Sequence, residues 1–402
     1  MSQLSDGLTA LGHEITVITA FPHYENFRIW PEYRGKLMER KREKDIDIIR
    51  LYTYAPGKKS MVNRLVSYLT FNTLASLVCV LSRSRWDVIL CPNGSFFTGL
   101  TAWLVEIVKR VSFIYNVQDL YPDVPVRAGQ LRNPYAIGAL RKLENFMYRK
   151  AAHITVISPP MWDNLIAKGV RPEKISIIPN FVDTDFIRPL PKDNKFAQQH
   201  GLADKFVVTH AGNLGYVYDL DTMLDAAALL HWEEDIVFLI VGNGVTRSSL
   251  EGKARKLELN NVRFMPFQPR EELPWLRASS DVQVSLYKSG AANESFPSKI
   301  YEIMASGRPL VASSENGSEI ETVVNTAQCG ICIKPGNARD LAAAILRLRR
   351  NPLLWASMGQ RGRQYAEANH SKQAAVARYN ELFHKIASPL IRDTRKLMSY
   401  QA

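Results

Sequence analysis

The chain has 402 residues, of which 46% are hydrophobic and 22% are charged. This composition excludes a disordered or collagen-like protein, and the length favours two domains with cores of their own. The formal net charge of +12 is concentrated in the first half, because Lys and Arg exceed Asp and Glu by eight over residues 1–190 and by four over the rest.

The first half of the chain predicts strands that alternate with helices. Short, continuous apolar runs separated by helical segments are typical of a parallel sheet covered on both faces. The expected strands are residues 14–19, 46–52, 87–91, 113–117, 154–158 and 175–178, and the expected helices are residues 65–81 and 137–150. We therefore expect a Rossmann-like, doubly wound N-terminal domain over residues 1–188.

The second half repeats this alternation after a proline-containing segment, residues 188–192, where we place the link between domains. The expected strands are residues 206–211, 236–241, 262–265, 282–286, 309–312 and 330–333, and the expected helices are residues 220–231, 341–349 and 373–386. We expect a second Rossmann-like domain over residues 189–370, and a helix within 371–402 that packs back on the first domain. Two such domains predict a central cleft, with ligands at the carboxyl ends of the strands.

The most informative segment is residues 291–313. Glu294 and Glu302 lie eight positions apart and flank a Phe-Pro-Ser-Lys run. Proline suits the first turn of a helix, so a helix is expected to start near Ser298, and its free N–H groups together with Lys299 favour a diphosphate. Glu302 is placed to accept the two hydroxyl groups of a ribose, and Glu294, in the preceding loop, is placed to face a sugar.

This segment resembles the retaining glycosyltransferases of family 4, which have the GT-B fold. Their Glu-x7-Glu element is followed by small residues, glycine, a basic residue and proline, as in Ala-Ser-Gly-Arg-Pro at 305–309. The Pro-Ser-Lys form is similar to the bacterial exopolysaccharide and O-antigen branch, which includes the colanic acid transferases. Further similarities, covering essentially the whole chain, lie at residues 179–183, 212–215, 240–244 and 264–269.

The resemblance implies transfer of a sugar from a nucleotide diphosphate sugar, foremost a UDP-sugar, with retention of anomeric configuration and without a metal or other cofactor. It implies catalytic roles for Glu294, Lys299 and Asp119, and acceptor-site roles for His23 and Gln118. The implied donor-binding residues are Gly212, Asn213, Gly215, Gly242, Phe267, Gln268, Ser298 and Glu302.

The sequence departs from the family pattern in three places. Asn213 and Tyr218 stand where the family's glycine loop carries Arg and Lys, so Lys299, with Lys288 or Arg308, has to supply more of the charge that faces the diphosphate. A Gln-Asp pair at 118–119 stands where the family has His-Asp. The family's first strand and glycine-rich loop are expected to be missing before residues 5–19, which would leave the N-terminal sheet without a central strand.

A charge-free apolar run, residues 65–81, is followed by Arg83 and Arg85. Seventeen residues lie at the lower limit for a membrane span, so the run indicates an interfacial helix, with an ordinary core helix as the alternative. With the basic first half, it favours a lipid-linked acceptor and a cytoplasmic enzyme that is peripheral on the inner face of the plasma membrane.

Two other functions on the same architecture stay open: a nucleotide-sugar-binding protein with little or no catalysis, and a nucleotide-sugar 2-epimerase. The Cys329-x-x-Cys332 pair lacks the second pair of ligands that a zinc site needs, so no metal site is predicted. No nucleic-acid-binding motif accompanies the basic charge, so nucleic acid is not expected as a partner.

Overall fold

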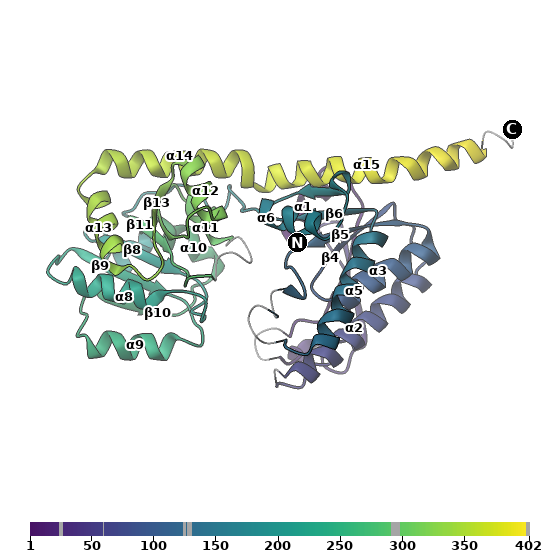
Figure 1. Cartoon of the computed structure of the whole chain (residues 1–402), viewed down its shortest axis with the longest axis horizontal. Coiled ribbons are helices and arrows are strands. Elements are labelled where there is room, and N and C mark those ends of the chain that lie inside the picture. Colours follow the sequence, from purple (N-terminus) through teal and green to yellow (C-terminus); the bar gives the residue numbers. More distant parts are fainter. Residues whose placement is uncertain (24–26, 59, 124–125, 127–130, 291–297, 399–402) are drawn as a thin grey trace. The chain divides into compact units, whose positions relative to one another are not determined.

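The structure is a computed structural model, and it describes residues 1–23, 27–58, 60–123, 126, 131–290 and 298–398. The chain divides into two compact units, coloured along the sequence in Figure 1. The N-terminal unit comprises residues 1–179 together with 375–402, and the C-terminal unit comprises residues 180–374. The segment from residue 375 onward belongs to the N-terminal unit, where the Tyr379 hydroxyl accepts a hydrogen bond of 3.0 Å from Asn116.

The N-terminal unit contains two sheets. In the first, β1 (Ile15–Ala20) pairs in parallel with β3 (Ile46–Leu51), and β2 (Met38–Glu43) pairs with β3 in the antiparallel sense. The second sheet is parallel, in the order β4 (Val88–Pro92), β5 (Ser112–Val117), β6 (His153–Val156) and β7 (Ile175–Ile177). Its helices are α1 (Ser2–Ala10), α2 (Met61–Leu81), α3 (Phe96–Lys109), α5 (Pro134–Lys150), α6 (Pro159–Ala167) and α15 (Lys372–Met398), with 3-10 turns η1 (Pro31–Tyr33) and η2 (Pro172–Lys174).

Among the described residues, β1 and β4 lie in separate sheets. This division is the gap that the missing central strand, expected from the sequence, would leave in a single N-terminal sheet. The strand β2 was not predicted, since its Met-Glu-Arg-Lys-Arg-Glu sequence is almost entirely charged and lies at an exposed edge. The long apolar helix is confirmed, but it begins at Met61 rather than residue 65, because the Ser60 hydroxyl accepts a hydrogen bond from Asn63 N at 3.1 Å and caps the helix.

The C-terminal unit has one parallel six-stranded sheet, in the order β10-β9-β8-β11-β12-β13. The strands are β8 (Phe206–Ala211), β9 (Ile236–Val241), β10 (Val262–Met265), β11 (Val282–Ser285), β12 (Leu310–Ser313) and β13 (Gly330–Ile333). The helices are α7 (Lys195–Gln199), α8 (Leu220–Leu229), α9 (Arg247–Lys256), α10 (Leu273–Ala278), α11 (Lys299–Ala305), α12 (Glu319–Ala327), α13 (Ala338–Arg349) and α14 (Pro352–His370), with a 3-10 turn η3 (Arg270–Glu272).

Helices cover both faces of this sheet (Figure 1), which explains why its strands are apolar throughout. Alternate residues of β9 enter different cores: Phe238 and Ile240 pack with α8 and α13, whereas Val237 and Leu239 pack with α7 and α10. A strand buried on both faces cannot show the alternation of apolar and polar residues that marks a half-exposed strand. The predicted doubly wound architecture is confirmed for this unit.

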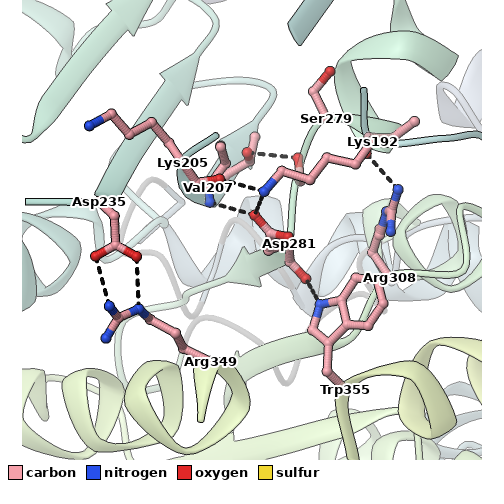
Figure 2. Close-up of polar contacts among 12 residues, drawn as sticks. Lys192, Lys205, Val207, Asp235, Ser279, Asp281, Arg308, Arg349 and Trp355 are labelled. Carbon is pink, nitrogen blue, oxygen red and sulfur yellow. Dashed lines mark hydrogen bonds and ion pairs between the residues drawn. The ribbon is translucent and has the colours of Figure 1, made fainter. Parts of the chain in front are cut away.

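A polar network fixes the amino ends of β8 and β11 (Figure 2). Asp281 accepts hydrogen bonds from Lys192 Nζ at 2.6 Å and from Val207 N at 2.7 Å, and its carbonyl oxygen accepts one from Trp355 Nε1 at 2.5 Å. Burial raises the pKa of Asp281, while the Lys192 ammonium opposes that shift. Arg308 joins this network by donating to Ala278 O at 2.6 Å. It is therefore held at the amino ends of the strands, away from their carboxyl ends.

Candidate functional site

The strand order of the C-terminal sheet reverses at one point, at the edge of the sheet where the strands have their carboxyl ends. β8 lies between β9 and β11, and the chain builds β9 and β10 on one side of β8 and β11 to β13 on the other. In open parallel sheets of this kind, ligands bind outside the carboxyl ends of the strands where the order reverses. The loops that leave β8 and β9 lie at this point, and α11 follows β11 in the chain.

The loops after β8 and β9 interlock through two glycines. Gly212 has φ of +143° and Gly242 has φ of +144°, and a Cβ atom on Gly242 would lie 1.8 Å from the carbonyl oxygen of Gly212. The Leu214 N–H also donates to the Asn243 carbonyl at 2.9 Å. Only glycine permits this close approach, so the predicted glycine positions have a steric reason in the structure.

Lys299, the first residue of α11, reaches the Gly212 loop. A Cβ atom on Gly212 would lie 2.3 Å from Lys299 Nζ, so the missing side chain of Gly212 makes room for the ammonium group. Within the described part of the chain, this buried Nζ has no hydrogen-bond partner. Burial lowers the Lys299 pKa to about 8, repulsion from Arg277 adds to the shift, and attraction from Glu302 opposes it.

Tyr218 supplies the surface on which this ammonium group rests. Lys299 Nζ lies 4.0 Å from the centre of the Tyr218 ring, a cation–π distance. The Tyr218 ring lies 5.0 Å from that of Tyr287 and 5.5 Å from that of His210, between ring centres. Burial and the charge of Lys299 lower the His210 pKa to about 3, so His210 is neutral at physiological pH and adds no positive charge.

Glu302 lies one turn into α11, and its carboxylate is paired with Arg277 of α10. The Arg277 side chain is only 5% exposed, whereas that of Glu302 is 40% exposed. Arg277 also donates to Gln283 Oε1 at 2.6 Å, and Gln283 Nε2 donates to Ser306 Oγ at 2.9 Å. A buried chain of polar groups thus holds Glu302 from behind while part of its carboxylate stays accessible.

Sequence reasoning missed Arg277. The available signal was an arginine between Leu276 and Ala278, in a short apolar helix that precedes a buried strand. A fully buried arginine requires a partner carboxylate. The two cations, Lys299 and Arg277, face one carboxylate, Glu302, so the described part of this site is short of one negative charge.

The other predicted donor-site residues lie on loops of the same unit. Asn213 and Gly215 belong to the loop after β8, and Ser298 directly precedes α11, where its carbonyl accepts from Tyr301 N at 3.1 Å. Phe267 and Gln268 follow β10; the Phe267 side chain is exposed, and Gln268 Nε2 donates to the Pro266 carbonyl at 3.0 Å. Glu294, predicted to face the sugar, lies outside the described residues.

Lys288 and Arg308, the two cations expected to act together with Lys299, are exposed or placed elsewhere. Arg308 is buried in the network at the amino ends of the strands, and its guanidinium also lies 5.2 Å from the centre of the Trp355 ring. The suggestion that Arg308 faces the diphosphate is therefore wrong. Lys288 is exposed, and its backbone N–H donates to Val217 O at 3.0 Å.

The remaining candidates belong to the N-terminal unit. Gln118 and Asp119 follow β5; Gln118 Nε2 donates to Asn116 Oδ1 at 2.7 Å, and burial raises the pKa of the Asp119 carboxyl. His23 Nδ1 lies 2.7 Å from the carbonyl oxygen of Phe21. No group of three or more His, Cys, Asp or Glu side chains is arranged to hold a metal ion among the residues that the structure describes.

Comparison with known proteins matches both halves of the chain. The family model described as glycosyl transferases group 1 matches residues 192–365, and the glycosyl transferase 4-like domain matches residues 1–180. A protein of Escherichia coli (strain K12) named as a colanic acid biosynthesis glycosyl transferase, WcaI, is 26% identical over 94% of this chain and 93% of its own length.

Solved structures of the same architecture also match. Sucrose-phosphate synthase from Thermosynechococcus elongatus matches with a TM-score of 0.74 and 19% identity, over 96% of this chain and 92% of its own. Anabaena HepE, solved in complex with UDP, matches with a TM-score of 0.69 and 16% identity, over 92% of this chain and all of its own.

Proposed function

We propose a donor and an acceptor for this chain from one premise: the chain is a glycosyltransferase of the GT-B fold and of the family 4 type. The donor is a nucleotide diphosphate sugar, foremost a UDP-sugar, and the sugar is transferred with retention of anomeric configuration. The acceptor is a lipid-linked saccharide in the biosynthesis of a surface polysaccharide.

One observation carries this proposal: the ammonium group of Lys299 is buried and has no hydrogen-bond partner among the described residues. Burying an unpaired charge is costly, and a protein keeps such a group where a ligand supplies the opposite charge. A diphosphate brings two negative groups and several acceptor oxygens, and it fits the deficit left by Lys299 and Arg277 against Glu302. Negative charge that builds up on the leaving diphosphate would be stabilised by Lys299 without reorganisation of solvent.

The other residues take roles consistent with this ligand. Gly212, Gly215 and Gly242 let backbone approach the phosphates, with Asn213 and Ser298 beside them. The exposed edge of the Glu302 carboxylate accepts the ribose hydroxyls, and the loop with Phe267 and Gln268 receives the nucleobase. Glu294 faces the transferred sugar. Asp119, Gln118 and His23 serve the acceptor, and the reaction needs no metal ion.

The similar proteins support the finer parts of the proposal. The HepE structure contains UDP, which favours uridine as the nucleoside, and the name of WcaI links it to colanic acid, a polysaccharide. A lipid-linked acceptor places the enzyme in the cytoplasm, peripheral on the inner face of the plasma membrane.

A turnover assay tests this function. The full chain would be incubated with UDP-, GDP- and dTDP-sugars in turn, together with a lipid extract, and the products followed by mass spectrometry, with NMR reporting the anomeric configuration. We expect transfer of sugar to a lipid from a UDP-sugar, with configuration retained. UDP binding without turnover would indicate a binding protein, and an isomer formed from UDP-N-acetylglucosamine alone would indicate an epimerase; either result would contradict the proposal.

A further inference from the structure

Helix α2 of the N-terminal unit has one face in the core and one face exposed. Its inner face contributes Ala75, with Leu74 and Val78 packed alongside, to the cluster around Leu51 of β3. Its outer face exposes a row of apolar side chains, from 40% for Tyr68 to 76% for Leu81. The exposed large apolar side chains of α2 are Val62, Leu65, Tyr68, Leu69, Leu77 and Leu81.

Helix α3 widens this apolar surface. The two helices are joined side by side, since the hydroxyls of Ser76 and Thr101 lie 3.1 Å apart and Lys109 Nζ donates to the carbonyl of Ser82. The outer face of α3 exposes three more apolar side chains, Leu104, Ile107 and Val108. We call these nine side chains of α2 and α3 the α2–α3 face. Monomeric soluble proteins rarely leave a patch of this kind exposed without a function.

The charges around this face are predominantly positive; the carboxylates on or soon after α2 and α3 are the half-buried Glu106 of α3 and the exposed Asp87. Exposed cations lie on or directly after α2 and α3 at Arg64, Arg83, Arg85 and Arg110. Helix α5, which packs against α3, exposes Arg141, Lys142, Arg149 and Lys150. The one carboxylate of α5, Glu144, is buried and bonded to Lys168 and Tyr148, so the described surfaces of α2 and α5 carry no exposed carboxylate.

A basic cavity of about 570 Å³ continues this charge pattern along the second half of α5. Five of its lining residues are cations: Lys142, Arg149, Lys168, Arg171 and Lys174. Lys168 is neutralised by Asp123 and Glu144, and Lys174 donates to the carbonyls of Tyr148 and Arg149. Lys142 and Arg149 have no ion pair with a described carboxylate, so they are available to an external anion.

The length of α2 does not make it a membrane span. Residues Val62–Leu81 are long and apolar enough to cross a bilayer by length and composition, but a span would strip Leu74, Ala75 and Val78 from the core against β3. A second copy of the chain fits poorly, because it would set the arginines and lysines of one copy near those of the other, and like charges oppose association. An anionic lipid surface offers both apolar depth and phosphate groups.

We infer that the α2–α3 face inserts into the interface of an anionic membrane leaflet, with the cations of α5 and the basic cavity on the lipid phosphates. The inference rests on the proposed function only because a lipid-linked acceptor gives the enzyme a reason to be at a membrane. To that function the inference adds the surface of the chain that contacts the membrane. The apolar side chains would enter the boundary between headgroups and acyl chains, and the long Arg and Lys side chains would stay at headgroup level.

Vesicle flotation with the full chain tests this inference. Vesicles of phosphatidylcholine alone are compared with vesicles that also contain phosphatidylglycerol. We expect the wild type to bind the anionic vesicles at least tenfold more strongly, with binding that weakens as salt rises. Leu65→Glu with Leu69→Glu should abolish most binding to either vesicle, whereas Lys142→Gln with Arg149→Gln should remove mainly the part that depends on phosphatidylglycerol.

A matched control separates this face from exposed apolar residues in general. Trp232 of the C-terminal unit is 61% exposed, and Trp232→Glu should leave vesicle binding unchanged. UDP binding, measured by calorimetry on every variant, should stay at the wild-type level, so loss of membrane binding and loss of the donor site are told apart. The inference is overturned if the wild type ignores anionic vesicles, if Leu65→Glu with Leu69→Glu binds like the wild type, or if light scattering shows a dimer that these changes break.

Discussion

The Lys299 site of the C-terminal unit and the α2–α3 face of the N-terminal unit differ in how they depart from an ordinary folded protein. At the first, charge lies where apolar groups are expected, because an ammonium group is buried over Tyr218 with no hydrogen-bond partner in the part of the chain that the structure describes. At the second, apolar groups lie where charge is expected, because leucines line the exposed side of α2.

Each departure costs free energy in the isolated chain, and we propose that each is offset by a different kind of ligand. The proposed ligand of the buried ammonium group is a small anion that enters a site of fixed geometry. The proposed ligand of the exposed apolar face is a broad, fluid surface that needs no fixed geometry. Changes at the first region should therefore alter stability and UDP affinity together, and changes at the second should leave both nearly unchanged while they weaken membrane binding.

The largest effect is expected from Arg277→Met. This change leaves Gln283 Oε1 buried without its donor and Glu302 without its cation, and should lower the free energy of unfolding by about 3 kcal/mol in urea titrations. The control is Arg141→Met on α5, whose guanidinium is 57% exposed and 4.0 Å from Asp123, and which should cost less than about 1 kcal/mol. Equal costs for the two variants would refute the buried-charge account.

Lys299→Met should act in the opposite direction and stabilise the free protein, by about 2 kcal/mol at pH 7. The folded-state pKa of Lys299 is lowered to about 8 from 10.5, so between these values the unfolded chain binds a proton that the folded chain does not. The free energy of unfolding of the wild type should therefore increase as the pH rises from about 8 to 10.5, and that of the variant should not. Urea titrations from pH 7 to pH 10 measure this, and a less stable variant at pH 7 would count against it.

Tyr218→Leu should weaken UDP binding about tenfold, because a desolvated cation–π contact is worth roughly 1–2 kcal/mol. Without the ring, the ammonium form of Lys299 is less stable, so the loss of UDP affinity with rising pH should begin at a lower pH than in the wild type. Tyr218→Phe keeps the ring and should keep both the affinity and the pH profile. If Phe and Leu behave alike in calorimetry at several pH values, the ring does not hold the ammonium group.

The smallest effect is expected from Leu69→Glu on the α2–α3 face. Its side chain is 43% exposed, so the free energy of unfolding should change by less than about 0.5 kcal/mol. Leu51→Ala, in the core behind the same helix, should cost about 2–5 kcal/mol. A large loss of stability in Leu69→Glu would mean that this face is packed in the native protein rather than left for a membrane.

The sequence was sufficient to predict the C-terminal sheet, because each of its strands is a continuous apolar run between helices. The family resemblance of residues 291–313 also singled out Lys299 and Glu302, which the structure places on α11. The sequence was not sufficient for Arg277, whose partner Glu302 is 25 residues away, or for Tyr218, whose ring meets Lys299 only after folding. The charged strand β2 lacked an apolar signal. The division of the N-terminal strands into two sheets corresponds to the gap that the expected loss of a central strand would leave.

The interfacial character of α2 was predicted from its composition, but the extent of the surface was not. Leu104, Ile107 and Val108 are ordinary residues of an apolar helix in the sequence, and only their exposure in the folded unit joins them to α2. The basic cavity along the second half of α5 likewise gathers residues from 142 to 174 that have no local motif.

The most direct test of the central claim is a calorimetric titration of UDP and of uridine into the wild type, Lys299→Met and Lys299→Arg. If a diphosphate neutralises the buried ammonium group, the wild type should bind UDP at least tenfold more tightly than uridine. Lys299→Met should lose most of this preference while its weak uridine binding persists, and Lys299→Arg should retain part of it. An unchanged preference for UDP in Lys299→Met would show that the diphosphate is held elsewhere, and would contradict the account.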